Sequence, residues 1–332
     1  MIRLLFSLTF FLVTGFGCVA QSIDEMHANA RFFIQRGDYD NAIIILNRGL
    51  QDAPGNIKFS KELALVYFYK NEFKKGLKVI VPLLDSSSAD EQCFEIAGMF
   101  YKEQQDIEAC KGVFQKGVIR FPESGSIRFE LGEILWAQKK AEAIYEWEKG
   151  IQNDPSYPGN YYSACKFYGL TEDRPRELIY GEIFVNLEPN SKKTLEIKER
   201  LFKGYKKLFS ETKLTNPNEK NIFIRNFLEV MNKQTAMAKL GITTGSLIMI
   251  KTRFILDWNN EYADKYPFKL FQYHQQLLQE GLFEAYNQWL FGATENLPAF
   301  QLWIQNHSQV FNEFSEFQKN RIFRLPKGQY YQ

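Results

Sequence analysis

The sequence is poor in the residues that build metal centres and disulfide frameworks. Its 332 residues include three histidines and four cysteines. No histidine has a Cys, Asp or Glu at metal-ligand spacing, so we expect no metal and no cofactor. Three cysteines lie outside the N-terminal leader, far apart in sequence: Cys93, Cys110 and Cys165. An odd, widely spaced set favours buried thiols, with one disulfide among them as the alternative.

Charge of one sign and long apolar runs are also scarce. The 41 Lys and Arg residues nearly balance the 39 Asp and Glu residues, so net charge predicts neither nucleic-acid binding nor attachment to an anionic surface. The most apolar internal segment, GSLIMIKTRFIL (245–256), is interrupted by Lys251 and Arg253. We therefore expect no transmembrane segment in the mature chain.

Motifs for catalysis are absent as well. The segment GITTGS (241–246) has neither the spacing nor the lysine of a phosphate-binding loop, and no histidine accompanies a nucleophile motif. We predict that the chain is not an enzyme. The alternative is a catalytic or carbohydrate-binding site in the C-terminal third, for which Asp257, Glu261 and His274 are the candidate catalytic residues.

The one long apolar run lies at the N-terminus. Residues 1–20 combine Arg3, an apolar stretch and small residues that end at Ala20, which is the layout of a secretory signal peptide. We expect cleavage after Ala20 and export, with the periplasm as the destination. Lipid anchoring through Cys18, as a subunit of an outer-membrane complex, is the alternative. It is disfavoured because Gly15 stands where a lipobox usually carries leucine.

What the sequence does contain is a pattern that repeats about every 34 residues. One series of small residues has spacings of 34, 34, 34 and 33: Ala30, Ala64, Gly98, Gly132 and Cys165. A second series follows it: Ala42, Gly76, Cys110 and Ala143. Prolines close most of the units: Pro54, Pro122, Pro155 and Pro189. Antiparallel helices approach closely only where side chains are small, and proline ends a helix, so the pattern predicts about five helix pairs.

This pattern resembles the tetratricopeptide repeat (TPR) family, whose period is about 34 residues. The resemblance implies an all-α helical solenoid over residues 21–190. Residues 191–221 are predicted to form a capping helix and linker, and residues 222–332 an irregular, aromatic-rich helical domain. Glu177 stands where the second series requires a small residue, and we expect the fifth helix pair to be splayed there.

In TPR arrays the first helix of each pair lines a concave groove, which implies a protein or peptide partner. Carried over by position, the groove residues are Arg31, Ile34, Gln35, Lys61, Leu65, Phe68, Tyr69, Met99, Lys102, Phe129, Glu133, Trp136, Tyr162 and Lys166. Aromatic residues of this kind supply binding energy at low entropic cost. The alternative is that Phe68, Tyr69 and Trp136 pack against C-terminal helices that fold back into the groove.

The C-terminal third is rich in aromatic residues at helical spacing. We interpret Phe283, Tyr286, Trp289 and Trp258 as core, because such stripes are usually buried. Together these patterns predict an exported, non-catalytic interaction scaffold in the cell envelope.

Overall fold

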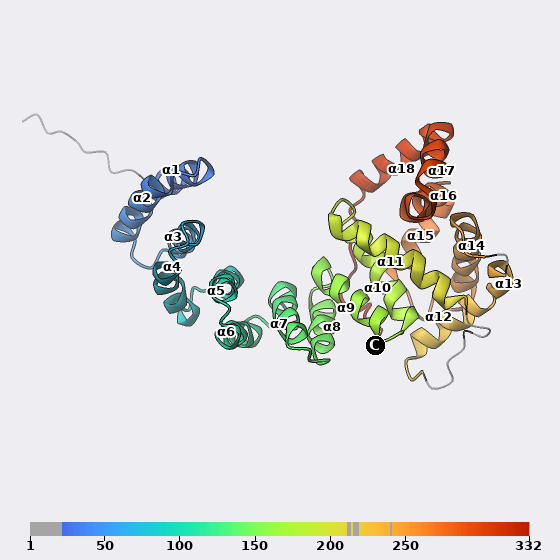
Figure 1. The fold of residues 1–332 in the computed structure, drawn as a ribbon, viewed down its shortest axis with the longest axis horizontal. Helices are drawn as coiled ribbons and strands as arrows, with labels where there is room; N and C mark the ends of the chain where they lie inside the picture. Colours follow the sequence, from blue (N-terminus) through green and yellow to red (C-terminus); the bar gives the residue numbers. More distant parts are fainter. Residues whose placement is uncertain (1–21, 211–213, 215–218, 240, 332) are drawn as a thin grey trace, which may run out of the picture. The chain divides into compact units, whose positions relative to one another are not determined.

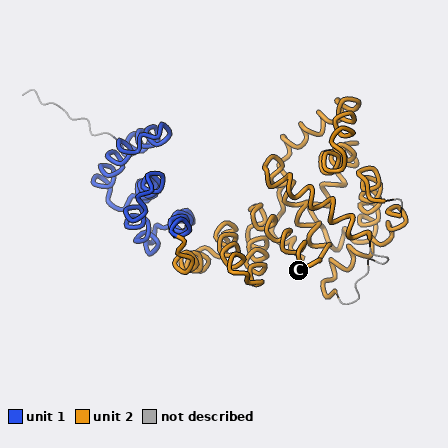
Figure 2. Tube along the Cα trace, in the orientation of Figure 1, with its two compact units in different colours: residues 1–104 blue, residues 105–332 orange. Residues whose placement is uncertain are grey.

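The computed structural model describes residues 22–210, 214, 219–239 and 241–331, and every regular element in these ranges is a helix (Figure 1). The all-α prediction is confirmed. Residues 1–20, with the predicted signal peptide and Cys18, lie outside the described residues. The chain divides into two compact units, residues 1–104 and residues 105–332 (Figure 2). The predicted boundaries at 190 and 221 fall inside the second unit.

Unit 1 consists of short helices joined by tight turns. In chain order they are α1 (Ile23–Gln35), α2 (Tyr39–Asp52), α3 (Ile57–Tyr69), α4 (Phe73–Ile80), the 3₁₀ helix η1 (Val81–Asp85) and α5 (Glu91–Glu103). The helices α1 and α2 pack as one pair, α3 and α4 as the next, and α2 contacts α3 between the pairs.

Unit 2 continues the helix pairs and then departs from them. Its paired helices are α6 (Ile107–Arg120), α7 (Gly125–Ala137), α8 (Ala143–Asn153), α9 (Pro158–Leu170), α10 (Arg174–Leu187) and α11 (Lys192–Leu208). The C-terminal helices are α12 (Ile222–Asn232), α13 (Thr235–Ala238), α14 (Thr244–Glu261), α15 (Lys269–Gln279), α16 (Phe283–Asn287), the π-helix η2 (Gln288–Gly292), α17 (Ala293–Asn306) and α18 (Ser308–Asn320).

The backbone repeats the 34-residue period at five turns. One residue in each turn is left-handed, with φ between +56° and +73°: Gly37, Asn71, Gln105, Lys139 and Glu172. In three of these turns the next residue is an aspartate that caps the following helix through its side chain: Asp38, Asp106 and Asp173. Only one of the five left-handed residues is glycine, although the conformation costs other residues about 1–2 kcal/mol. The sequence alone therefore hides this part of the repeat.

The N-caps of the first helices show that the array extends beyond residue 190. Four of them are side-chain caps at steps of 34 residues: Ser22, Asn56, Asp90 and Ser124. Ser191 caps α11 in the same way, and it stands 34 residues after Tyr157, the N-cap of α9. The helix α11, predicted as a cap, therefore occupies the position of the first helix of a sixth pair.

Both small-residue series mark close helix contacts, as their spacing predicts. A Cβ atom at Gly76 would lie 2.1 Å from the Phe100 ring, and one at Gly132 would lie 2.3 Å from Trp147 Nε1. The four prolines each stand two residues beyond the end of a second helix, namely α2, α6, α8 and α10. The predicted helix pairs are confirmed.

The expectation of a splayed fifth pair at Glu177 is wrong. Glu177 is buried between α9 and α10, and a Cβ atom at Gly169 of α9 would lie only 2.3 Å from Glu177 Oε1. In this pair the small residue is Gly169, on the partner helix α9, so the Glu177 carboxylate fits without separating the two helices. Arg174 neutralises it at 2.6 Å. Further along, a Cβ at Gly181 would lie 3.0 Å from Cys165 Sγ, which shows that the close contact continues.

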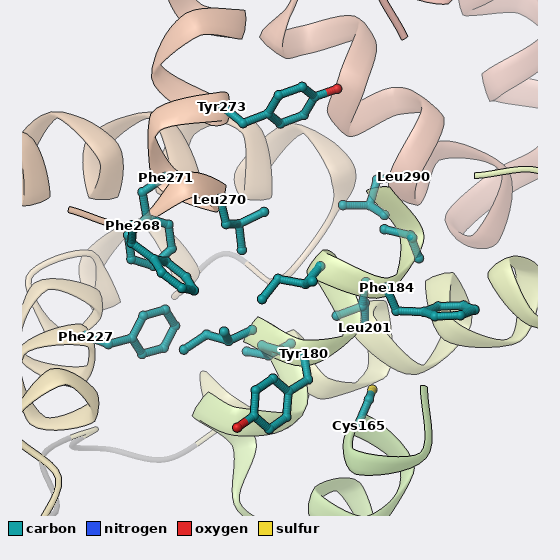
Figure 3. Close-up of a cluster of buried hydrophobic side chains, with 14 of the residues drawn as sticks. Cys165, Tyr180, Phe184, Leu201, Phe227, Phe268, Leu270, Phe271, Tyr273 and Leu290 are labelled. Atoms are coloured by element: carbon teal, nitrogen blue, oxygen red, sulfur yellow. The ribbon is translucent and has the colours of Figure 1, made fainter. Parts of the chain in front are cut away.

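One hydrophobic core in unit 2 joins the last helix pairs to the C-terminal helices. It contains buried side chains from Ala143 to Leu325, and Figure 3 shows side chains of the array and of α15 meeting within it. The aromatic residues predicted as core are confirmed for Trp258, Phe283 and Tyr286, which are at most 3% exposed, whereas Trp289 is half-buried.

The cysteines behave as small core residues. Cys93 and Cys165 are buried free thiols, and Cys110 is also buried. Burial raises the pKa of the Cys93 thiol to about 11 and shifts that of Cys165 in the same direction, so little reactive thiolate exists near neutral pH.

Candidate interaction surface

In unit 1 the predicted groove residues divide into an exposed group and a packed group. The exposed group consists of Arg31, Gln35, Tyr69, Met99 and Lys102. Ile34 and Leu65 are half-buried. The Phe68 ring lies 5.2 Å from that of Phe100, and Lys61 forms an ion pair with Asp90, the N-cap of α5. Phe68 and Lys61 therefore contribute to the stacking of α3 on α5 as well as to the surface.

In unit 2 the helices α7 and α9 bring the other predicted residues onto one surface. The two helices are in contact, and Ser163 Oγ of α9 donates a 2.7 Å hydrogen bond to Glu133 of α7. Lys166 Nζ lies 4.7 Å from the centroid of the Tyr162 ring, within cation–π range. Ser163 is buried, whereas Glu133, Tyr162, Lys166 and Phe129 are half-buried, so these four are held in place yet remain accessible.

The helix α11 adds two residues that sequence reasoning missed. Lys193 Nζ lies 4.8 Å from the centroid of Tyr162 and 5.9 Å from that of Phe129. Glu196 accepts a 2.6 Å hydrogen bond from the Tyr162 hydroxyl and lies 3.5 Å from Lys166. The signal that could have found them is the N-cap series, which continues to α11. We refer below to seven residues as the unit 2 face: Phe129, Glu133, Trp136, Tyr162, Lys166, Lys193 and Glu196.

The indole of Trp136 lies at one end of this face and is 37% exposed. Its ring centroid lies 6.0 Å from that of Trp147 and 5.7 Å from that of Phe167, which belong to α8 and α9. In the described residues no ring of the C-terminal helices contacts it. For Trp136 the alternative of burial under those helices is therefore wrong.

A buried polar cluster, which the sequence did not predict, connects α10 to the C-terminal helices. Both carboxylate oxygens of Glu182 accept hydrogen bonds from Lys251 at 2.9 Å, and the Tyr205 hydroxyl donates to Oε1 at 2.6 Å. His274 Nε2 lies 3.2 Å from Oε2. We call these four residues the Glu182 cluster, and none is more than 3% exposed.

Burial opposes ionisation of Glu182, but Lys251, His274 and Tyr205 outweigh it and lower its pKa to about 2. Burial in turn lowers the pKa of Lys251 and that of His274. The cavity beside the cluster has a volume of about 10 Å³, which is roughly the space of one water molecule. The charges are thus mutually compensated in a closed site.

The residues of the enzyme alternative do not converge. Asp257 accepts a 2.7 Å hydrogen bond from Gln234, and Glu261 pairs with Lys233 at 2.6 Å near the surface. His274 belongs to the Glu182 cluster instead. Within the described ranges, no group of three His, Cys, Asp or Glu side chains is placed to hold a metal ion. Nor does any described helix have the length and apolar character required to cross a membrane.

No protein-family model and no curated protein matches the chain. Among solved structures, PilF of Pseudomonas aeruginosa shares 20% identity over 55% of this chain and 84% of its own, with a TM-score of 0.48. YrrB, titled a TPR protein with an unusual peptide-binding site, shares 16% over 54% and 92%, with a TM-score of 0.39. The TPR protein TTC0263 of Thermus thermophilus shares 12% over 55% and 99%, with a TM-score of 0.41.

These TM-scores all lie below 0.5, so the assignment of the class rests on the helices themselves. Paired helices with a 34-residue period, small residues at their contacts and prolines after the second helices define a TPR array. The chain is therefore an all-α helical-repeat protein whose repeat is similar to that of the TPR family.

Proposed function

We propose that this protein is a non-catalytic scaffold that binds a protein or peptide partner through the first helices of its repeats. The observation that carries the proposal is the unit 2 face, where aromatic rings and charged groups from three successive first helices are ordered by mutual contacts and remain accessible. Ordered aromatic groups bind at low entropic cost, because little side-chain freedom is left to lose. Exposed Tyr69 and Met99 offer the same chemistry in unit 1.

The proposal includes a location in the cell envelope, which is supported by the signal-peptide layout of residues 1–20. Mass spectrometry of the mature protein tests this part. Soluble export gives an N-terminus at Gln21, whereas lipid anchoring gives an acylated Cys18. An intact Met1 would contradict both.

Affinity capture with matched variants tests the binding face. Tyr69→Ala with Trp136→Ala removes exposed aromatic area from first helices, while Ile44→Ala with Tyr145→Ala removes exposed apolar area from the second helices α2 and α8. We expect the first pair of substitutions to lose a partner that the second pair retains. Thermal melting of both variants shows that they are folded. A partner lost only from the control pair, or none captured by any form, contradicts the proposal.

A further inference from the structure

We propose that a cavity bounded by α9, α10 and α11 binds an oxyanion that carries more than one negative charge, as a phosphate group or adjacent carboxylates do. The cavity has a volume of about 260 Å³, close to the lower end of ligand pockets. It is far larger than the space beside the Glu182 cluster. Four cations line it: Arg174, Arg200, Lys203 and Lys207.

The three carboxylates of the lining offset only part of the charge of these four cations. Glu177 is bound by Arg174 at 2.6 Å. Glu196 is bound by the Tyr162 hydroxyl and by Lys166, which does not line the cavity. The third carboxylate, Glu199, is exposed and lies 3.7 Å from Lys203, a pair that water screens strongly.

The cations on α11 share one side of that helix. Arg200, Lys203 and Lys207 stand at positions i, i+3 and i+7, which places them along a single face. Lys207 forms no ion pair within the described part of the chain, and Arg200 reaches Glu177 only at 3.5 Å. Their charges are therefore available to a ligand.

Arg200 also presents an unsatisfied donor. Its Nε atom is buried and has no hydrogen-bond partner among the described residues. Arg200 as a whole is half-buried, so a ligand in the cavity meets the accessible part of its guanidinium and not the Nε atom. The first turn of α10 contributes Arg174 and Glu177 to the same cavity.

Calorimetric titration of the full chain at constant ionic strength tests the site with two probes, inorganic phosphate and a capped tetraglutamate peptide; tetraglutamine is the neutral control. We expect at least one anionic probe to bind. Lys203→Gln with Lys207→Gln should weaken that binding about tenfold or more, because both charges face the ligand. The control, Lys192→Gln with Lys206→Gln, removes the same charge from the same helix outside the cavity and should change binding less than twofold.

Tighter binding of phosphate would assign the site to phosphate groups, and tighter binding of the peptide would assign it to acidic chains. Either result supports the proposal. If neither probe binds, the proposal is overturned. An equal loss of binding in the control variant also overturns it, because the effect would then come from the overall positive charge of α11 and not from the cavity. The cavity shares only Glu196 with the unit 2 face, and none of its cations belongs to that face, so failure of this test would leave the proposed scaffold function untouched.

Discussion

Glu177 and Glu182 lie on the same helix, α10, and both are 2% exposed, yet they serve different surroundings. Glu182 meets a lysine, a histidine and a tyrosine from three other helices in a closed site. Glu177 meets Arg174 and Arg200 beside an open cavity. In the closed site every charge has a buried partner, which connects the C-terminal helices to the array. In the open site the cationic side chains outnumber the carboxylates that line the cavity, so a ligand can supply the missing negative charge.

The largest effect is expected from Glu182→Ala. This change leaves the Lys251 ammonium buried without its partner, and breaking a buried pair costs about 3–5 kcal/mol. Urea unfolding followed by circular dichroism should show a correspondingly lower free energy of unfolding. Glu199→Ala, at an exposed carboxylate, is the control and should change stability by less than about 0.5 kcal/mol. Equal effects of the two changes would remove the distinction between closed and open sites.

Acidification should also lower the stability of the protein, through the Glu182 cluster. Burial holds the pKa of His274 below its usual 6.5, so the unfolded chain binds more protons and stability falls as the pH drops through 6.5. Glu182 adds a second loss as the pH falls from 4.5 towards about 2. Urea unfolding at pH 8, 5.5 and 4 measures the trend, and His274→Asn should flatten its first part. A stability that rises on acidification would contradict this assignment.

Gly169→Ala should have an intermediate effect at the open site. The added Cβ would lie 2.3 Å from Glu177 Oε1 and 2.5 Å from an Arg200 nitrogen. Both atoms end flexible side chains, but moving the Glu177 carboxylate disturbs its buried ion pair with Arg174, so we expect a cost of about 1–3 kcal/mol. The control is Gly112→Ala in α6, where no atom lies within 4 Å of the new Cβ. Better helix propensity should stabilise that variant by up to about 1 kcal/mol. The two melting temperatures should therefore move in opposite directions, and a shared direction would argue against the close contact.

The smallest effect is expected from Lys207→Gln, which removes a cation that has no ion-pair partner in the described residues. We expect the free energy of unfolding to change by less than about 0.5 kcal/mol. A clear loss of stability would show that Lys207 serves the fold rather than a ligand. Thermal melting beside wild type is sufficient to decide this.

The sequence predicted the features that depend on the local spacing of residues. It did not reveal the features in which a residue on one helix compensates for the size or charge of a residue on another. Small residues and prolines revealed the helix pairs because each acts at a fixed place in every repeat. The left-handed turns were hidden because Gln105, Lys139 and Glu172 are not residue types that favour that backbone. The fifth pair was misjudged because Gly169, outside the repeat pattern, makes room for Glu177.

The Glu182 cluster could not be predicted for a similar reason. Glu182 and Lys251 are 69 residues apart, and nothing in the spacing of charges relates α10 to α14. On the candidate surface, position within the repeat was enough to predict Tyr162 and Lys166. Lys193 and Glu196 could be predicted only if α11 was known to continue the 34-residue repeat.

The central claim is that partners bind to the first helices of the array. Site-specific photocrosslinking in intact cells tests it most directly, with a benzophenone amino acid at Met99 or Trp136 on first helices. The matched positions are Ile44 and Tyr145, exposed apolar residues on the second helices α2 and α8. We predict crosslinks to the same partner from Met99 and Trp136 and none from the other two positions. Crosslinks from Ile44 or Tyr145 alone would place the interface on the second helices and contradict the proposed binding face.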